Sequence, residues 1–366
     1  MIRLATVFSG IGSIEWALKR MNIEHEIVFA CDNGDIEIKD INEDEEANKI
    51  RNLRTLEEQV DYERKIYSKS KKTNFVKQSY IANYGISETN YHYNVRFLDG
   101  RKYKGKVDLF VGGSPCQSFS IMGYKKGFED TRGTLFYEYA RLVKEIQPKV
   151  FIYENVQGLL KHDGGKTWKR IQEVFNDLGY RFTYRVMDSK DCGIPQTRRR
   201  LIVVGFKDKS KNIEEPKAVK LNFTLQDFLE TTTKTGNFIC ENGIIKLKKE
   251  PGEIDNKYFL SEAVYKHVMS PGSGNYYTKP EIDLKIARPL LATMHKMHRA
   301  GVDNYVTYKE KVRRLTPREC LRLMGYDDSF KIVVSDTQAY KQAGNSIVVD
   351  MMICIMSEIL KVENFK

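Results

Sequence analysis

Short apolar runs alternate with amphipathic segments through the first two hundred residues, and this alternation constrains the fold more than any other feature of the chain. The runs have the length of buried strands, and several of the segments between them repeat apolar residues at helical spacing. Alternating strands and helices form a mostly parallel sheet with helices on both faces. The predicted strands are residues 4–8, 27–30, 107–111, 150–153, 184–187 and 201–206.

Two regions differ from this alternation. Residues 39–72 are densely charged and helix-prone, acidic early and basic late, so we expect a helical insertion on the surface. Its basic end is suited to contact a phosphate backbone, although a solvated helix is the commoner outcome for such a charge run. Residues 207–311 are rich in Lys and in turn-forming sequence, which is typical of a smaller, loop-rich domain. Helical spacing occurs at residues 14–21, 135–146, 317–324 and 347–360.

Composition narrows the cellular setting. The formal net charge of +11 and the isoelectric point near 9.1 indicate an anionic partner, although a solvated Lys-rich face explains them equally well. The six cysteines are scattered without a C-x-x-C pair, which argues against a zinc ribbon or a disulfide framework and for a reducing compartment. No apolar run approaches the ~20 residues of a membrane helix, and the N-terminus is typical of a strand. We expect a cytoplasmic protein with no metal, in which His295 and His298 are surface histidines.

A glycine loop, residues 8–12, follows the first predicted strand and opens the first predicted helix. Parallel sheets bind nucleotides at this position, because glycine permits close backbone approach and the helix N-terminus favours an anionic group. Asp32 ends the second strand about 20 residues further on, where an acid typically accepts hydrogen bonds from ribose hydroxyls. The pattern G-x-G-x-x-G is not met, and a tight turn that needs glycine explains this loop nearly as well.

Cys116 lies just beyond the strand predicted at residues 107–111, within the sequence GGSPCQSFS. A lone cysteine is usually an inert core residue, but this one is flanked by Gly, Ser, Pro and Gln outside any apolar period. We therefore interpret it as a nucleophile. The loop that follows contains several glycines and carries Lys125, Lys126 and Arg132, so it is suited to move and to bring positive charge toward a phosphate.

Two more polar motifs adjoin predicted strands. Glu154 directly follows the strand at residues 150–153, and an acid at a strand end in a sheet that holds a nucleophile suits proton transfer. The motif QTRRR, residues 196–200, leads into the next strand. In extended chain, Arg198 and Arg200 point to one face and Arg199 to the other. The pair on one face forms a clamp for an anion or a carbonyl, although a solvated edge is the alternative.

In their order and spacing, these motifs resemble the cytosine-5 DNA methyltransferases of the bacterial or phage restriction-modification type. The resemblance is carried by FSGIGSIEWAL, GGSPCQSFS, ENV, QTRRR, RRLTPRECLRLMGY and QAGNSIVV, and it covers residues 1–38, 76–206 and 312–360. It implies an enzyme that uses S-adenosyl-L-methionine to methylate carbon 5 of a cytosine flipped out of duplex DNA.

The resemblance also implies a fold and a division into domains. The fold is an α/β sheet of the S-adenosylmethionine-dependent, Rossmann-like methyltransferase type, mostly parallel with one reversed strand. Residues 1–206 and 338–366 form a catalytic, cofactor-binding domain, and residues 207–337 form a smaller target recognition domain and hinge. The DNA lies in the cleft between the two domains.

Individual residues receive roles from the same resemblance. Cys116 is implied as the nucleophile that adds to carbon 6, and Glu154 as the group that engages the ring nitrogen. Arg198 and Arg200 steady the surroundings of the nucleophile and the target base. The implied cofactor-binding residues are Phe8, Ser9, Gly10, Ile11, Gly12, Asp32, Asn33, Asn94, Val95, Pro115, Leu135, Asn345, Ser346 and Ile347. The implied DNA-binding residues are Gln117, Ser118, Ser120, Lys125, Lys126 and Arg132.

Two positions depart from the pattern of the family. Asn94 stands where the family often has an acid that contacts the adenine amine, which leaves the adenine contact open. Pro289 and Leu290 stand where the recognition domain has a Thr-Leu pair, which leaves the base-reading geometry open.

Two other functions fit parts of the sequence. An RNA (tRNA) cytosine-5 methyltransferase shares the motif set, although the sizeable segment 207–311 favours an enzyme that reads DNA sequence. A catalytically silent DNA-binding regulator has no need of Cys116, Glu154 and Arg198. We expect a monomer whose partner is double-stranded DNA, with a cognate restriction endonuclease as functional partner by family analogy alone.

Overall fold

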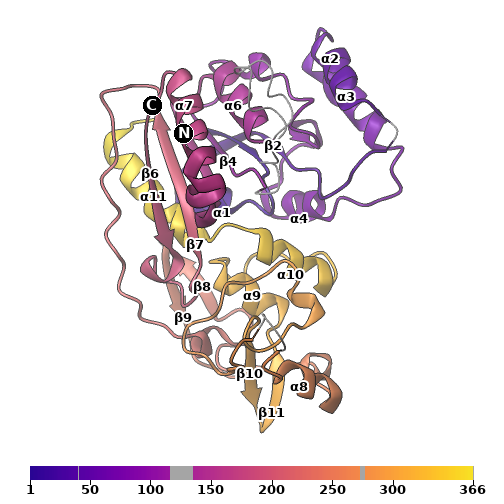
Figure 1. Cartoon of the computed structure of the whole chain (residues 1–366), viewed down its shortest axis with the longest axis vertical. Coiled ribbons are helices and arrows are strands. Elements are labelled where there is room, and N and C mark those ends of the chain that lie inside the picture. The colour runs from indigo at the N-terminus through magenta and orange to yellow at the C-terminus, as the bar shows by residue number, and fades with distance from the viewer. Residues whose placement is uncertain (40, 116–134, 273–276, 366) are drawn as a thin grey trace.

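A sheet of seven strands organises the part of the chain that the structure describes (Figure 1). The computed structural model describes residues 1–39, 41–115, 135–272 and 277–365. The strands are β1 (Ile2–Val7), β2 (His25–Cys31), β3 (Tyr91–His92), β4 (Leu109–Gly112), β5 (Val150–Val156), β6 (Arg181–Asp188) and β7 (Arg199–Phe206). Their order is β3-β2-β1-β4-β5-β7-β6, and β7 alone runs in the direction opposite to the other six strands. The predicted fold class is confirmed.

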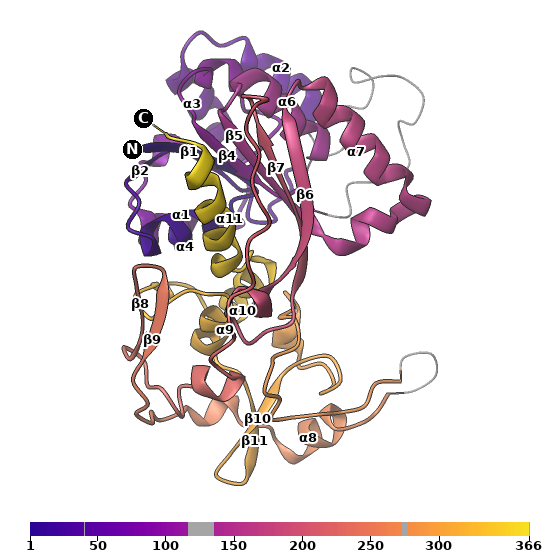
Figure 2. The same cartoon turned by 90° about the vertical axis from the view of Figure 1, so that its left-hand side faces the viewer.

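The two faces of the sheet bury alternate side chains under different helices. Leu109 and Ile152 pack with α1 (Ser13–Arg20) and α11 (Val349–Val362). Phe110 and Phe151 pack with α6 (Leu135–Ile146) and α7 (Lys166–Asp177) on the other face. Figure 2 shows the sheet between these two helical layers. Because both faces are covered, the strands read as continuous apolar runs in the sequence.

The predicted helices form close to their expected bounds. The helix α6 has the predicted bounds, whereas α11 begins at Val349, two residues later than predicted. The preceding helix, α10 (Asp336–Asn345), ends just before it, and Ser346 and Val348 adopt extended backbone between the two. Within the described residues, the segment Asp336–Val362 is long and apolar enough to cross a membrane, but 67% of its most apolar window is buried. This burial is what a core helix shows.

Residues 207–337 contain mostly loops and short elements, as predicted. The elements are β8 (Phe238–Glu241), β9 (Ile244–Leu247), α8 (Glu262–Val268), β10 (Tyr305–Tyr308), β11 (Lys311–Arg314) and α9 (Pro317–Leu323). The strands form two separate hairpins, β8-β9 and β10-β11. Both views place α8, β10 and β11 at the end of the molecule away from the sheet (Figures 1 and 2). The domain boundaries at residues 206 and 338 stay a prediction.

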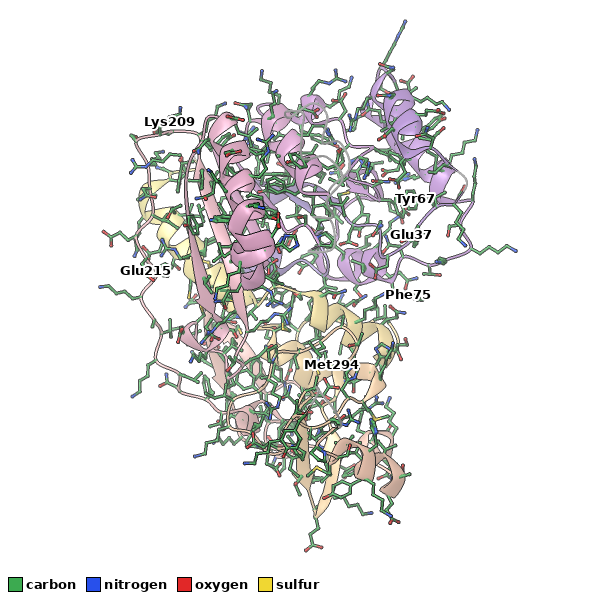
Figure 3. The ribbon with its side chains drawn as sticks, viewed as in Figure 1. Glu37, Tyr67, Phe75, Lys209, Glu215 and Met294 are labelled. Carbon is green, nitrogen blue, oxygen red and sulfur yellow. The ribbon has the colours of Figure 1, made fainter. Side chains whose placement is uncertain are left out.

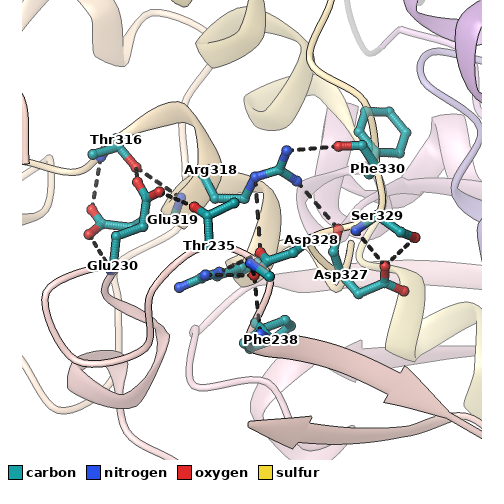
Figure 4. Close-up of polar contacts among 12 residues, drawn as sticks. Glu230, Thr235, Phe238, Thr316, Arg318, Glu319, Asp327, Asp328, Ser329 and Phe330 are labelled. Atoms are coloured by element: carbon teal, nitrogen blue, oxygen red, sulfur yellow. Dashed lines mark hydrogen bonds and ion pairs between the residues drawn. The ribbon is translucent and has the colours of Figure 1, made fainter. Parts of the chain in front are cut away.

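Buried charge is prominent in this loop-rich region. Arg313 and Glu319 form an ion pair of 2.7 Å with both side chains 0% exposed. Glu319 also completes a capping box with Thr316 at the start of α9. Figure 4 shows neighbouring contacts, in which Arg318 donates to the carbonyl oxygen of Phe330 at 2.8 Å. The region is therefore held by polar contacts as well as by apolar packing.

The charged segment at residues 39–72 forms two helices, α2 (Glu43–Arg51) and α3 (Leu56–Tyr67), as predicted. Asn42 caps α2, and Thr55 forms a capping box at the start of α3. The helix α4 (Phe75–Tyr84) returns the chain to the sheet. Figure 1 shows α2 and α3 at the periphery of the molecule, and Figure 3 shows Tyr67 of α3 on the same side as Glu37 and Phe75.

Candidate active site

The glycine loop after β1 meets the loop after β2 at the carboxyl edge of the sheet. Phe8 and Gly10 both have positive φ, 52° and 53°, so the loop turns sharply away from the strand. The carboxylate of Asp32 accepts from the backbone nitrogens of Gly10, at 2.9 Å, and Gly34, at 2.8 Å. Burial raises the pKa of Asp32, while these hydrogen bonds act in the opposite direction. Asp32 therefore ties together the two loops that sequence reasoning assigned to the cofactor.

The composition of this edge fits an adenosyl cofactor. Among the described residues, a Cβ added to Gly10 would meet no heavy atom within 4 Å, so a ligand has close access to the backbone there. Asp32 offers carboxylate oxygens to ribose hydroxyls, and the sheet order β3-β2-β1 places Asp32 between Gly10 and Asn94. These features suit a ligand with a polar head, a ribose and a base laid along the edge.

The other predicted cofactor residues differ in exposure. Ile11 and Val95 are buried in the apolar cores on the two faces of the sheet. Ser346 is buried and Ile347 half-buried. Exposed or half-buried positions, which leave atoms free for a ligand, are Phe8, Ser9, Asn33, Asn94, Pro115, Leu135 and Asn345.

Glu154 and Arg200 form an ion pair at the end of β5. The Nε atom of Arg200 lies 2.9 Å from Oε1 of Glu154, and the two side chains are 19% and 14% exposed. The antiparallel register of β5 and β7 makes this contact possible, because it pairs Val156 with Arg200. Burial raises the pKa of Glu154, while the positive charges of Arg200 and Arg198 oppose the rise. Such a carboxyl is suited to exchange a proton with a bound base.

Gly113, which directly follows β4, allows Glu154 to approach the chain that leads to Cys116. A Cβ at Gly113 would lie 2.7 Å from Oε2 of Glu154 and 2.8 Å from its carbonyl oxygen. Because real Cβ contacts are longer, any larger residue at position 113 displaces the carboxyl or the strand end. This close approach explains a glycine that the motif alone left without a role.

Three polar side chains fix the strand end that precedes Cys116. Asn155 donates to the carbonyl oxygen of Ser114 at 3.0 Å and to the hydroxyl of Tyr153 at 2.9 Å. The hydroxyls of Ser114 and Tyr153 lie 2.7 Å apart. Ser114 and Asn155 are buried polar residues inside predicted motifs, and sequence reasoning missed their contacts because each contact depends on the neighbouring strand. They join the end of β4 to the end of β5.

The QTRRR motif alternates as predicted. Arg199 pairs with Asp188 at 3.2 Å on one side, while Arg198 and Arg200 point to the other. Arg198 is 3% exposed and acts as a carbonyl clamp, because it donates to the carbonyl oxygens of Leu290, Gly344 and Ser346 at 2.8 to 3.0 Å. Burial lowers the pKa of Arg198, and the charge of Arg200 acts in the same direction.

Gln196 adds a further link between the two regions of the molecule. Its amide donates to the carbonyl oxygen of Leu323 at 2.8 Å and accepts from the backbone nitrogen of Leu290 at 3.0 Å. Gln196 and Arg198 thus bind the backbone nitrogen and the carbonyl oxygen of Leu290, next to Pro289, where the sequence departs from the Thr-Leu pair of the family. The departure leaves these two backbone contacts in place.

Part of the predicted site lies outside the described residues. These positions are Cys116, Gln117, Ser118, Ser120, Lys125, Lys126 and Arg132. Within the described residues, no group of three or more His, Cys, Asp or Glu side chains is placed to hold a metal ion. One nitrogen of the His298 ring lies 2.9 Å from the hydroxyl of Thr293.

The protein has the S-adenosylmethionine-dependent methyltransferase fold of the α/β class. Two features define it: the sheet order with the reversed strand β7, and the glycine loop bound to Asp32 at the carboxyl edge of the sheet. The solved Dnmt2 methyltransferase of S. pombe aligns over 99% of both chains with a TM-score of 0.65 and 17% identity, which supports this fold. Residues 50–361 match the model of the C-5 cytosine-specific DNA methylase family, and the chain belongs to that family.

Relatives of known type agree with this assignment. The Type II methyltransferase M.SsoII of Shigella sonnei is 35% identical over 295 residues, which cover 78% of this chain and 71% of the relative. The Type II methyltransferase M.HhaI of Haemophilus parahaemolyticus is 36% identical over 262 residues, which cover 71% of this chain and 77% of the relative. The predicted family and class of enzyme are confirmed, and neither alternative function is favoured by these matches.

Proposed function

We propose that the protein flips a cytosine out of double-stranded DNA, adds the thiolate of Cys116 to carbon 6 and methylates carbon 5. The observation that carries this proposal is the carboxyl of Glu154, held by Arg200 at 2.9 Å and against the strand end that leads to Cys116. A nucleophile and a proton-exchanging acid at one edge of a sheet suit covalent activation of a ring.

Cys116 acts as a thiolate in the first step. A free cysteine is only a few per cent ionised at neutral pH, so nearby positive charge raises the reactive fraction. Addition of the thiolate forms a sulfur–carbon bond at carbon 6 and pushes the ring electrons toward nitrogen 3. Glu154 donates a proton to nitrogen 3, which its burial favours. Carbon 5 thereby becomes an enamine carbon that accepts a methyl group.

S-adenosylmethionine supplies an electrophilic methyl group when it is bound. The loop at residues 8–12 would hold its methionine end, Asp32 its ribose, and Asn33, Asn94 and Val95 its base, with Pro115, Leu135 and the segment 345–347 completing the pocket. After methylation, carbon 5 loses its proton to a base, a role that a bound water suits, the carbon 5–carbon 6 double bond re-forms as Cys116 leaves as a thiolate, and nitrogen 3 returns its proton to Glu154. Arg198 keeps the surrounding loops in place, and Arg200 contacts the target base.

The proposed substrate is duplex DNA, and the reaction requires the target cytosine to leave the base stack. Neither face of carbon 6 is accessible in stacked DNA, so the base must rotate out at a cost of a few kcal/mol. We assign recovery of that energy to phosphate and base-edge contacts from Gln117, Ser118, Ser120, Lys125, Lys126 and Arg132.

Residues 207–337 act as the target recognition domain, and residues 1–206 and 338–366 as the catalytic domain. We further propose a cytoplasmic monomer that protects DNA from a cognate restriction endonuclease.

The direct test substitutes the proposed nucleophile. Cys116→Ala should abolish transfer of labelled methyl groups to duplex DNA while binding of S-adenosylhomocysteine, measured by calorimetry, stays unchanged. Cys240→Ala, in β8, is the matched control and should retain activity. DNA that contains 5-fluorocytosine should trap a covalent adduct with the unmodified enzyme, because fluorine cannot leave as a proton does. Turnover by the Cys116 variant, or methylation of transfer RNA in place of duplex DNA, would contradict the proposal.

A further inference from the structure

The inserted helices α2 and α3 pack against two loops that belong to the proposed cofactor site. One loop follows β2 and the other follows β3, and both contribute apolar side chains to a cluster that the insertion completes. This cluster contains Ile36, Ala47, Ile50, Ile66, Tyr67 and Phe97. The rings of Tyr67 and Tyr93 stack with centroids 4.6 Å apart, and Figure 3 shows where Tyr67 lies. A freely solvated insertion would bury none of these residues, so the insertion is part of the wall behind the site.

Two carboxylates of the insertion hold the residue Asn94, which follows β3. Glu63 of α3 is 2% exposed and accepts from the backbone nitrogens of Tyr93, at 2.9 Å, and Asn94, at 2.7 Å. Glu43, the first residue of α2, accepts from the side-chain Nδ2 of Asn94 at 3.2 Å. The second oxygen of Glu43 lies 3.2 Å from Nε of Arg96. The insertion thus fixes both the backbone and the side chain of Asn94.

These contacts determine which way the Asn94 amide points. Its Nδ2 atom faces the carboxylate of Glu43, and its Oδ1 atom accepts from the backbone nitrogen of Arg96 at 3.0 Å. An amide oxygen has two acceptor positions, so Oδ1 keeps one for a further donor. The hydrogen bond to an anion polarises the amide and makes that oxygen a better acceptor.

Asn94 occupies the position where the base of a bound adenosine is expected. The sheet order β3-β2-β1 places the glycine loop, Asp32 and Asn94 in sequence along one edge, and the backbone nitrogen of Asp32 donates to the carbonyl oxygen of His92 at 3.1 Å. A ribose held by Asp32, with its sulfur-bearing end toward the glycine loop, directs its base toward β3. The exocyclic amine of adenine is a donor that needs an acceptor there.

We infer that Glu43 of the insertion is the positioning residue that sets the Asn94 amide, so that Oδ1 faces the adenine amine of the proposed cofactor. Glu43 takes no part in the chemistry and acts through Asn94 alone. The role assigns a function to residues 39–72, namely recognition of the base of the cofactor. It rests on the proposed cofactor site, so the test must separate the two.

The test compares binding of S-adenosylhomocysteine and S-inosylhomocysteine by calorimetry. The second ligand carries a ring carbonyl where adenine has its amine, so an oxygen facing that position repels it. The unmodified protein should prefer the adenosyl ligand by at least tenfold. In Glu43→Ala the Nδ2 atom of Asn94 loses its anionic partner and only the hydrogen bond from the backbone of Arg96 orients the amide, so the preference should fall below threefold. Glu57→Ala removes an exposed acid from the same insertion and should keep the full preference.

A paired variant distinguishes positioning from a merely structural effect. In Asn94→Asp/Glu43→Gln the amide and the carboxylate exchange places, so the new amide on α2 donates and the new carboxylate after β3 accepts from both that amide and adenine. This double variant should regain at least tenfold preference, whereas Asn94→Asp alone places two carboxylates together and should weaken binding of both ligands. A tenfold preference that survives in Glu43→Ala, or a double variant that fails to regain it, overturns the inference. If the unmodified protein binds neither ligand, the proposed function itself is contradicted.

Discussion

In the seven-stranded sheet, backbone polar groups pair with one another along the strands, and most of the buried side chains between them are apolar. Phe151 and Ile152, on opposite faces of β5, are both 0% exposed. In the region 207–337 the chain is mostly irregular, so many backbone carbonyl groups have no strand or helix partner. There, buried arginines take the place of the missing partners.

Arg322 illustrates this second mode of stabilisation. It donates to the carbonyl oxygens of Phe228, at 3.0 Å, and Thr233, at 2.7 Å, and also pairs with Asp328 at 2.8 Å. Its side chain is 0% exposed. A buried carbonyl without a partner costs about 1–3 kcal/mol, so one cation that satisfies two of them and a carboxylate stabilises an irregular fold.

The contrast changes how the net charge of +11 should be interpreted. The sequence left two explanations for that charge, namely an anionic partner and a solvated surface. Arg198, Arg313 and Arg322 belong to neither, because each is buried and bound to carbonyl or carboxylate oxygens within the chain. Part of the positive charge is therefore structural, and counts of basic residues overestimate what is free to contact DNA.

The largest expected effect comes from breaking the polar side of this comparison. Arg322→Met should lower the free energy of unfolding by about 3–5 kcal/mol, because the buried Asp328 loses its closest cation, with only Arg318 left at 4.0 Å, and two buried carbonyls lose their donor. Urea unfolding followed by circular dichroism measures the loss, and Lys217→Met on the exposed surface is the control. Arg322→Met/Asp328→Leu should recover only part of it, since the carbonyls of Phe228 and Thr233 remain unpaired. A loss below about 1 kcal/mol would refute the proposed role of buried arginine.

The apolar side of the comparison predicts a loss of a different kind. Ile152→Ala should lower the free energy of unfolding by about 3 kcal/mol, through lost burial and a cavity between the sheet and its helices. Ile152→Val, which removes one methylene, should cost about 1 kcal/mol. Neither loss should change between low and high sodium chloride, roughly 0.1 and 1 M, in the same unfolding experiment. A strong dependence on salt would show that the sheet region also relies on charge.

One ion pair in the sheet region sharpens the contrast through pH. Burial alone would raise the pKa of Asp108, but hydrogen bonds from Arg3 and Lys149 outweigh it and lower the pKa to about 2. A folded-state pKa below the unfolded value of about 3.9 adds stability that is present above about pH 4 and is lost as the pH falls toward about 2. Asp108→Asn should therefore cost about 1 kcal/mol at neutral pH, because both partners are partly exposed to solvent. The difference from the unmodified protein should vanish near the acid end of this range in thermal unfolding, and a constant difference would contradict the assignment.

The smallest effect is expected where charge is exposed. Lys266 and Glu262 form an i,i+4 pair of 2.8 Å on α8, with side chains 74% and 82% exposed. Lys266→Ala should change the free energy of unfolding by no more than about 0.5 kcal/mol, since water screens both charges. The same urea assay measures this change. A loss comparable to that of Arg322→Met would mean that burial does not separate the two kinds of charge.

Most of the sheet could be predicted because its strands are buried on both faces and therefore read as apolar runs. The strand β3 was not predicted, since Tyr91 and His92 are too short a run to show a period. The small hairpins were missed for the same reason. The insertion was predicted as helical from its composition, but its burial was not, because Ile36 and Phe97 lie outside it in the sequence.

The site shows a similar division. Motif order predicted Glu154 and the pair Arg198 and Arg200 as site residues, and local alternation placed Arg198 and Arg200 on the side of the strand away from Arg199, where the structure has them. The contacts of Ser114 and Asn155 were not predicted, because each depends on the neighbouring strand. The hydrogen-bond partners of Arg198 lie 92 to 148 residues away in the sequence. Local periodicity gives no information about contacts at such separations.

By itself, the sequence determined the family and the residue types that the chemistry requires, which follow from motif order, and most strands of the sheet, which follow from local periodicity. The reversed strand was implied only by the resemblance to the family. Only the tertiary structure decided that Glu43 meets Asn94, 51 residues further along the chain, and that buried arginines satisfy carbonyls in distant loops. The physical reason is that a hydrogen bond depends on the positions of two groups in space, and packing brings together groups that no local pattern relates.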